Sequence, residues 1–152
     1  MDLNQCGKVG FRLIKEGKKK EGADYMAKKC FDGNETRRGE TCSQASDTLY
    51  ELGELKASFL LSKHSCFELN YGNSCYSGGE TSEDDEIKLK FYLKGCELGH
   101  CFSCSEAAEI YIKKEEYLES VPFAEKSCLG ECKMSCEAYS RYNILRESGD
   151  KE

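Results

Sequence analysis

Small and apolar residues follow several cysteines of this chain at fixed distances. Small residues come three and four positions after a cysteine, and larger apolar residues come seven and eight positions after it. These spacings place side chains on one face of an α-helix. The small pairs include Ala45/Ser46, Gly78/Gly79 and Ala107/Ala108, and the larger pairs include Leu13/Ile14, Leu49/Tyr50 and Tyr111/Ile112. The pattern predicts helices whose small residues let a neighbouring helix approach closely.

A second set of helices ends at the remaining cysteines of the pattern. Apolar residues stand seven and five positions before these cysteines, as in Phe59/Leu61, Leu89/Phe91 and Val121/Phe123. Glycine then follows at Gly33, Gly99 and Gly130, where a helix C-cap takes a left-handed residue. We therefore expect helix–turn–helix units. The segment 75–86 is glycine-rich and acidic without an apolar face, so its helix should be short or frayed.

The chain has 11 cysteines in 152 residues, and nine of them alternate between long and short gaps. The long gaps (6→30, 42→66, 75→96, 104→128) span 24, 24, 21 and 24 residues, and the short gaps span 12, 9, 8 and 8. The resulting period of about 30 to 36 residues is typical of helical solenoids. A disulfide across each short gap would contribute about 2–3 kcal/mol. The predicted pairs are Cys30–Cys42, Cys66–Cys75, Cys96–Cys104 and Cys128–Cys136.

The alternation predicts an all-α fold, a right-handed α/α solenoid of antiparallel helix pairs stapled by disulfides. No proline- or glycine-rich linker divides the chain, so residues 1–152 should form one domain. The predicted units are 6–41, 42–74, 75–103 and 104–135, followed by a C-terminal capping helix over 136–148.

Three cysteines are left over by the predicted pairs, namely Cys6, Cys101 and Cys132. The odd number means that at least one is free or bonds to another molecule. For Cys101 and Cys132 we favour two unpaired thiols, and a bond or a shared metal ion between them is the alternative. Cys101 and Cys104 also form a CxxC pair, the spacing of thiol oxidoreductases, but no strand precedes them as in a thioredoxin-like fold.

Charge and hydropathy narrow the class of partner. The net charge of −6 disfavours nucleic acid, and no apolar stretch reaches the roughly 20 residues that a membrane span needs. The N-terminus lacks the pattern of a secretory signal.

His100 could join Cys101 and Cys132 as a copper or zinc ligand, but a lone turn histidine is usually just exposed, and His64 should lie on a helix surface. We expect no metal site and no cofactor, and haem and copper stay open as ligands.

The segment from Lys94 to Cys104 reads KGCELGHCFSC. It resembles the K-A-C-x-x-G-x-x-x-x-C signature of the cysteine-rich Sel1-like (TPR-like) repeat family, and looser matches stand at 28–42, 63–75 and 126–136. Two branches of the family share this pattern. One is the secreted Helicobacter cysteine-rich proteins, often labelled β-lactamase-like. The other comprises the Sel1-repeat assembly factors of cytochrome c oxidase in the mitochondrial intermembrane space, and the ELGH turn at 97–100 is closer to these.

The resemblance implies a protein-binding scaffold rather than an enzyme. We expect a monomer that binds protein partners through a concave face during respiratory-complex assembly, located in the intermembrane space. The alternatives are a secreted or periplasmic bacterial protein that binds host or cell-wall ligands, and a thiol-disulfide or metal-handling factor that uses the spare cysteines. No SxxK serine nucleophile with its partners is present, so the sequence predicts no catalytic residues.

Overall fold

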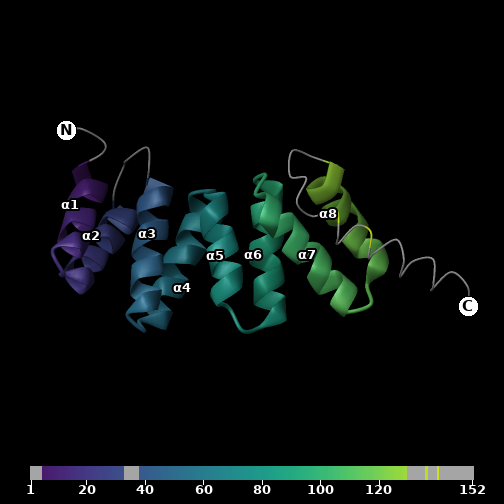
Figure 1. Ribbon diagram of the computed structural model, residues 1–152, viewed down its shortest axis with the longest axis horizontal. Helices are drawn as coiled ribbons and strands as arrows, with labels where there is room; N and C mark the ends of the chain where they lie inside the picture. The colour runs from purple at the N-terminus through teal and green to yellow at the C-terminus, as the bar shows by residue number, and fades with distance from the viewer. Residues whose placement is uncertain (1–4, 33–37, 130–135, 137–139, 141–152) are drawn as a thin grey trace, which may run out of the picture.

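The computed structural model describes residues 5–32 and 38–129 together with positions 136 and 140, and side chains from residue 8 onward. Throughout these ranges the regular structure is helical, as the sequence predicts (Figure 1). The elements are α1 (Gln5–Lys15), α2 (Lys19–Asp32), α3 (Arg38–Glu51), α4 (Leu55–Lys63), the π-helical turn η1 (His64–Glu68), α5 (Gly72–Thr81), α6 (Asp85–Glu97), α7 (Cys101–Lys113) and α8 (Tyr117–Leu129).

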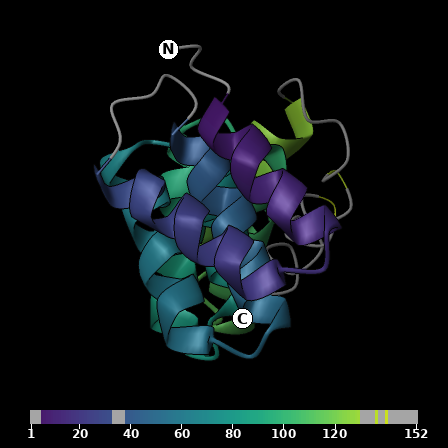
Figure 2. The same ribbon diagram turned by 90° about the vertical axis from the view of Figure 1, so that its left-hand side faces the viewer.

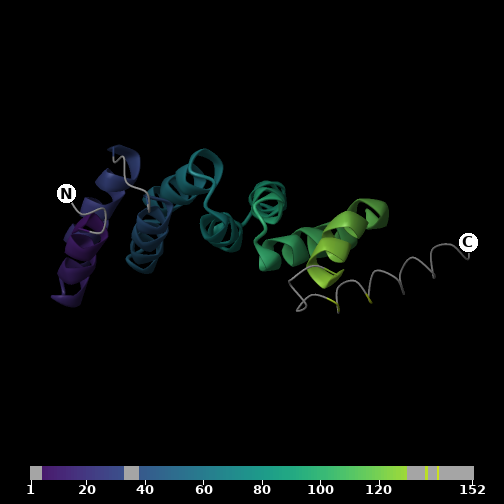
Figure 3. The ribbon, with the colours of Figure 1, turned by 90° about the horizontal axis from the view of Figure 1, so that it is seen from above.

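The helices stand in a row in chain order, from α1 at one end to α8 at the other (Figure 1). Each helix packs against the next one in the sequence, and α5 also contacts α3 and α7. Seen along the row, the helices lie behind one another, and from above they form a zigzag (Figures 2 and 3). Because every helix contacts only its near neighbours in sequence, the fold is a solenoid. The capping helix predicted over 136–148 lies mostly outside the described residues.

The core is divided into three small clusters rather than one deep centre. The largest surrounds Met26, Leu49 and Leu61, the second contains Phe91, and the third contains Tyr92. The half-cystines Cys30, Cys42, Cys66 and Cys75 belong to the first two clusters and are fully buried. A solenoid repeat buries little apart from its contacts with neighbours, so disulfides are an expected addition to such a core.

Helix α5 is short, as predicted, but its glycines form a packing surface instead of a frayed end. Gly78 and Gly79 are buried against the rings of Phe91 and Tyr92 on α6. A Cβ atom at either glycine would overlap the facing ring. The expectation of a helix without a buried face was wrong because it counted apolar side chains, whereas here the absence of a side chain creates the contact.

The uneven cysteine gaps correspond to local changes in helix geometry. The 21-residue gap begins at Cys75 inside α5. This helix is 10 residues long against 13 for α7, so the missing residues amount to about one helical turn. The 9-residue gap from Cys66 to Cys75 begins inside the π-helical turn η1, after which Leu69 N–H donates to the His64 carbonyl. A π turn accommodates one extra residue without ending the helix. The extra residue at η1 and the missing turn of α5 therefore leave the order of the helices unchanged.

Left-handed residues stand in several turns between helices. Gly99 has a φ of 85°, which confirms the predicted C-cap after α6, while Gly33 and Gly130 lie outside the described residues. Gly17, Gly53 and Glu115 have φ values of 83°, 80° and 61°. Each of these three stands eleven positions after a patterned cysteine, namely Cys6, Cys42 and Cys104. The turn between α7 and α8 therefore carries a glutamate, Glu115, in a backbone conformation that favours glycine.

Replacing Glu115 with glycine should therefore stabilise the protein by about 1 kcal/mol, because a side chain in the left-handed region costs roughly that much. Urea unfolding of the oxidised protein measures the change. Gly53→Ala is the reciprocal control and should destabilise by a similar amount. An unchanged midpoint for Glu115→Gly would show that this turn does not carry the expected strain.

Candidate protein-binding face

Four disulfides join the described helices, and they are the four pairs that the sequence predicts. Cys30–Cys42 joins α2 to α3, Cys66–Cys75 joins η1 to α5, Cys96–Cys104 joins α6 to α7, and Cys128 of α8 bonds to Cys136. Each bond ties the end of one helix pair to the start of the next. Several structural disulfides in a small domain are typical of proteins that fold in an oxidising compartment. In the described part of the chain, no helix has the length and apolar character to cross a membrane.

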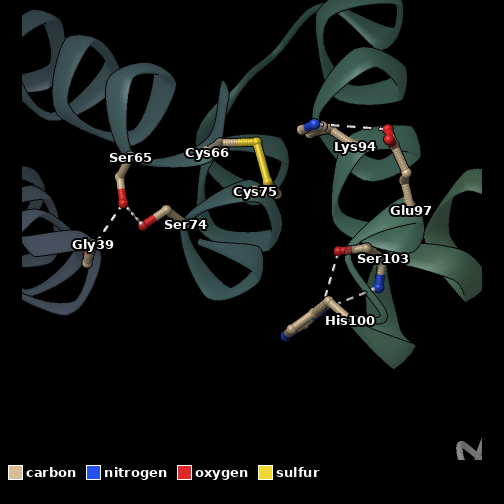
Figure 4. Close-up of a disulfide and its surroundings, with 9 residues drawn as sticks. All are labelled: Gly39, Ser65, Cys66, Ser74, Cys75, Lys94, Glu97, His100 and Ser103. Atoms are coloured by element: carbon tan, nitrogen blue, oxygen red, sulfur yellow. Dashed lines mark hydrogen bonds and ion pairs between the residues drawn. A yellow bond between two sulfur atoms is a disulfide. The ribbon is translucent and has the colours of Figure 1, made fainter. Parts of the chain in front are cut away.

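Buried serines lie next to the disulfides, and their hydroxyl groups form hydrogen bonds with one another (Figure 4). Ser74, which precedes Cys75, donates to the Ser65 hydroxyl at 2.7 Å, and Ser65 donates to the Gly39 carbonyl at 3.0 Å. Between α3 and α4, the Ser46 and Ser62 hydroxyls lie 2.6 Å apart. These four hydroxyls are buried and hydrogen-bonded, so they hold helices together.

Cys101 corrects one prediction, because it is disulfide-bonded rather than a free thiol. The four pairs above occupy the other half-cystines of the described residues, so the partner of Cys101 lies outside them. Cys132 and the side chain of Cys6 also lie outside the described residues. The alternation of long and short cysteine gaps could not reveal this bond, because Cys101 is not one of the nine cysteines in that alternation.

The CxxC pair therefore does not form a dithiol within α7. Cys104 is bonded to Cys96, and Cys101 is bonded elsewhere. Helix α7 follows α6 through a turn at Gly99, whereas a thioredoxin-like motif follows a strand. A sulfur that is held in a disulfide has no thiolate with which to attack a substrate.

The two histidines have different surroundings. His100 is the N-cap of α7, and its Nδ1 accepts from the Ser103 N–H at 3.4 Å (Figure 4). His64 was expected on a helix surface, but it is half-buried in η1 with its ring centroid 4.8 Å from that of Phe31. Among the described residues no three His, Cys, Asp or Glu side chains are grouped as metal ligands.

The pKa of His100 is lowered by its burial, so its neutral form is favoured in the folded state. The unfolded chain then binds more protons than the folded chain below the ordinary histidine pKa of 6.5. The stabilisation is complete above that pH and is lost as the pH falls through the lower folded-state value.

We therefore predict that the wild type loses more stability than His100→Asn between about pH 7.5 and about pH 5. Asparagine retains the N-cap but does not titrate. The difference should stay below about 1 kcal/mol because His100 is half exposed and solvent screens its charge. Urea titrations at both pH values measure it, and the comparison cancels the carboxylates that both proteins share. Parallel pH profiles would show that His100 is not responsible.

Side chains from α5 and α7 form a continuous surface, which we call the α5–α7 face. It consists of Tyr76 and Glu80 on α5, His100 before α7, and Phe102, Glu106 and Glu109 on α7. Tyr76 and Glu80 are four residues apart, and the α7 residues have spacings of four and three, so each set shares one side of its helix. The Tyr76 ring centroid lies 5.2 Å from that of His100 and 5.8 Å from that of Phe102. One end of the face is therefore aromatic.

The other end of the face is acidic and opens into a cleft of about 410 Å³. The Tyr92 hydroxyl donates to Glu80 Oε1 at 2.6 Å and so joins α6 to α5. At the edge of the cleft, Lys113 Nζ lies 3.2 Å from Asp85 Oδ2. The lining residues are Asp85, Lys88, Tyr92, Glu106, Glu109, Ile110, Ile112 and Lys113.

Burial and neighbouring charge perturb the groups around this cleft. The pKa of Glu106 is raised, mainly by burial and further by the carboxylates of Glu80 and Glu109, against a smaller opposing effect of Lys88. The pKa of Tyr76 is raised by burial and by Glu80 and Glu106. Glu80 therefore lies close enough to both Glu106 and Tyr76 to disfavour their charged forms.

Sequence reasoning did not identify this face. The available signal was the series Phe102, Glu106, Glu109 and Lys113, whose spacings of four, three and four mark one side of a helix. A polar helical stripe usually marks only a solvated surface, so the series alone carried no prediction. Its meaning depends on Tyr76 and Glu80 of the neighbouring repeat.

No family model and no curated protein matches the sequence. A solved structure described as "MamA RS-1 ArsTM double mutant" is similar to this chain with a TM-score of 0.56 over 100% of this chain and 99% of that chain. MamA is a TPR-like repeat protein. The chain has a TPR-like helical repeat fold. At 12% sequence identity the likeness concerns the fold alone.

Proposed function

We propose that this protein is a non-catalytic scaffold that binds other proteins through the α5–α7 face. The observation that carries the proposal is the combination on one face of the exposed Phe102 ring, which lies beside the half-buried rings of Tyr76 and His100, with an open, charged cleft. Aromatic side chains are enriched at the energetic centres of protein interfaces, and charged groups set the choice of partner. A solenoid presents such a face on rigid helices, which keeps the cost of ordering low.

We further propose that the scaffold supports cytochrome c oxidase assembly in the mitochondrial intermembrane space. The resemblance of 94–104 to the Sel1-like signature supports this lineage. The four disulfides fit a compartment where oxidation traps proteins after import. In the oxidised chain Cys101 is disulfide-bonded, so it offers no free thiolate for metal binding or nucleophilic attack.

Import into isolated mitochondria tests the location. The reduced chain should enter without a cleaved presequence and should then acquire disulfides and resist external protease. Cells that lack the protein should accumulate less assembled cytochrome c oxidase on native gels. Failure of import, together with export of the oxidised chain by a bacterial host, would instead favour the secreted alternative.

A further inference from the structure

The residues of the α5–α7 face indicate what kind of partner segment could bind there. We propose that this face binds a basic amphipathic segment of a partner protein, with a lysine or arginine beside Glu106 and an apolar side chain on the Phe102 ring. The proposal rests on the protein-binding function above and specifies the kind of partner.

The geometry of α7 sets the spacing within the partner. Phe102, Glu106 and Glu109 lie on one side of the helix, so at about 1.5 Å per residue their positions are roughly 6 Å and 10 Å apart along its axis. A partner must therefore place its apolar and basic side chains about one or two helical turns apart. An amphipathic helix does this with residues at i, i+4 and i+7.

The balance of charge at the cleft favours a cation. Asp85, Glu106 and Glu109 line it together with Lys88 and Lys113, and Glu80 lies close enough to raise the pKa of Glu106. Asp85 and Lys113 already pair with each other, so the carboxylates of Glu80 and Glu106 repel each other beside Lys88. A guanidinium or ammonium group would relieve this repulsion. Anionic lipid and nucleic acid would increase it.

The aromatic end supplies the apolar half of the contact. Phe102 is 47% exposed although its ring lies beside Tyr76 and His100. An apolar side chain placed there would bury the rest of the Phe102 ring. Rings that are held by neighbours before binding lose little side-chain entropy when the partner docks.

The test uses the oxidised full chain and two labelled synthetic peptides. One is an amphipathic helix of leucine and arginine, and its twin carries glutamate in place of every arginine. Fluorescence anisotropy should detect binding of the arginine peptide, weakened by salt, and little binding of its twin. Glu106→Gln and Phe102→Ala should each weaken binding by about fivefold.

Two matched variants serve as controls and should bind like the wild type. Glu125→Gln removes an exposed carboxylate on α8, and Leu60→Ala removes an exposed apolar side chain of α4 with 48% exposure. Circular dichroism verifies that every variant is folded. Equal binding of both peptides, or unchanged binding by Glu106→Gln, would overturn the inference.

The outcomes for this face and for the assembly function are separable. If the peptide fails to bind while cells still need the protein to assemble cytochrome c oxidase, the scaffold stands and the assigned face is wrong. If the peptide binds as expected but assembly is normal without the protein, the face stands and the assembly function is wrong.

Discussion

The double variant Cys66→Ala/Cys75→Ala should lose about 2–3 kcal/mol of unfolding free energy under oxidising conditions. The bond closes a short loop between η1 and α5 at the middle of the row, and the chain-entropy model assigns about that value to such a loop. Both cysteines are fully buried, so the smaller alanine side chains also give up some packing. Guanidinium titration followed by circular dichroism measures the change.

The same titration in the presence of a strong reductant is the control. Reduction removes the bond from the wild type as well, so the wild type and the double variant should then differ by less than about 0.5 kcal/mol. A difference that persists after reduction would mean that packing at these positions, rather than the covalent link, carries the stabilisation.

Gly78→Ala should destabilise the protein by about 2 kcal/mol, although alanine is the better helix former by about 1 kcal/mol. The added methyl group would overlap the Phe91 ring. That ring is 1% exposed and is also packed against Phe59 and Phe67, with centroids 5.8 Å and 5.2 Å away. Because the ring has little room to move, overpacking outweighs the gain in helix propensity.

Two variants test this explanation. Ser77→Ala changes the preceding, half-exposed residue of the same helix and should be close to neutral. Phe91→Leu reduces the facing side chain, so in the double variant with Gly78→Ala the cost should be less than the sum of the two single costs. Additive costs, or a stabilising Gly78→Ala, would contradict the close approach of α5 and α6.

The sequence by itself determined the repeat architecture and its covalent links. The alternation of long and short cysteine gaps predicts both the helix pairs and the four bonds such as Cys30–Cys42, because each bond closes a short loop between helices adjacent in the chain. The small pair Gly78/Gly79 likewise marked a close approach of helices. These features depend on local spacing, which the order of residues records directly.

Only the tertiary structure decided how the irregular parts fit and where the candidate face lies. The π-helical turn η1 and the shortened α5 accommodate gaps whose lengths alone do not say where residues were added or removed. The contact between the rings of Tyr76 and Phe102 depends on how one repeat stacks on the next. Helical periodicity places side chains around one helix axis, but it does not specify the rotation between neighbouring helices, and that rotation creates the surface.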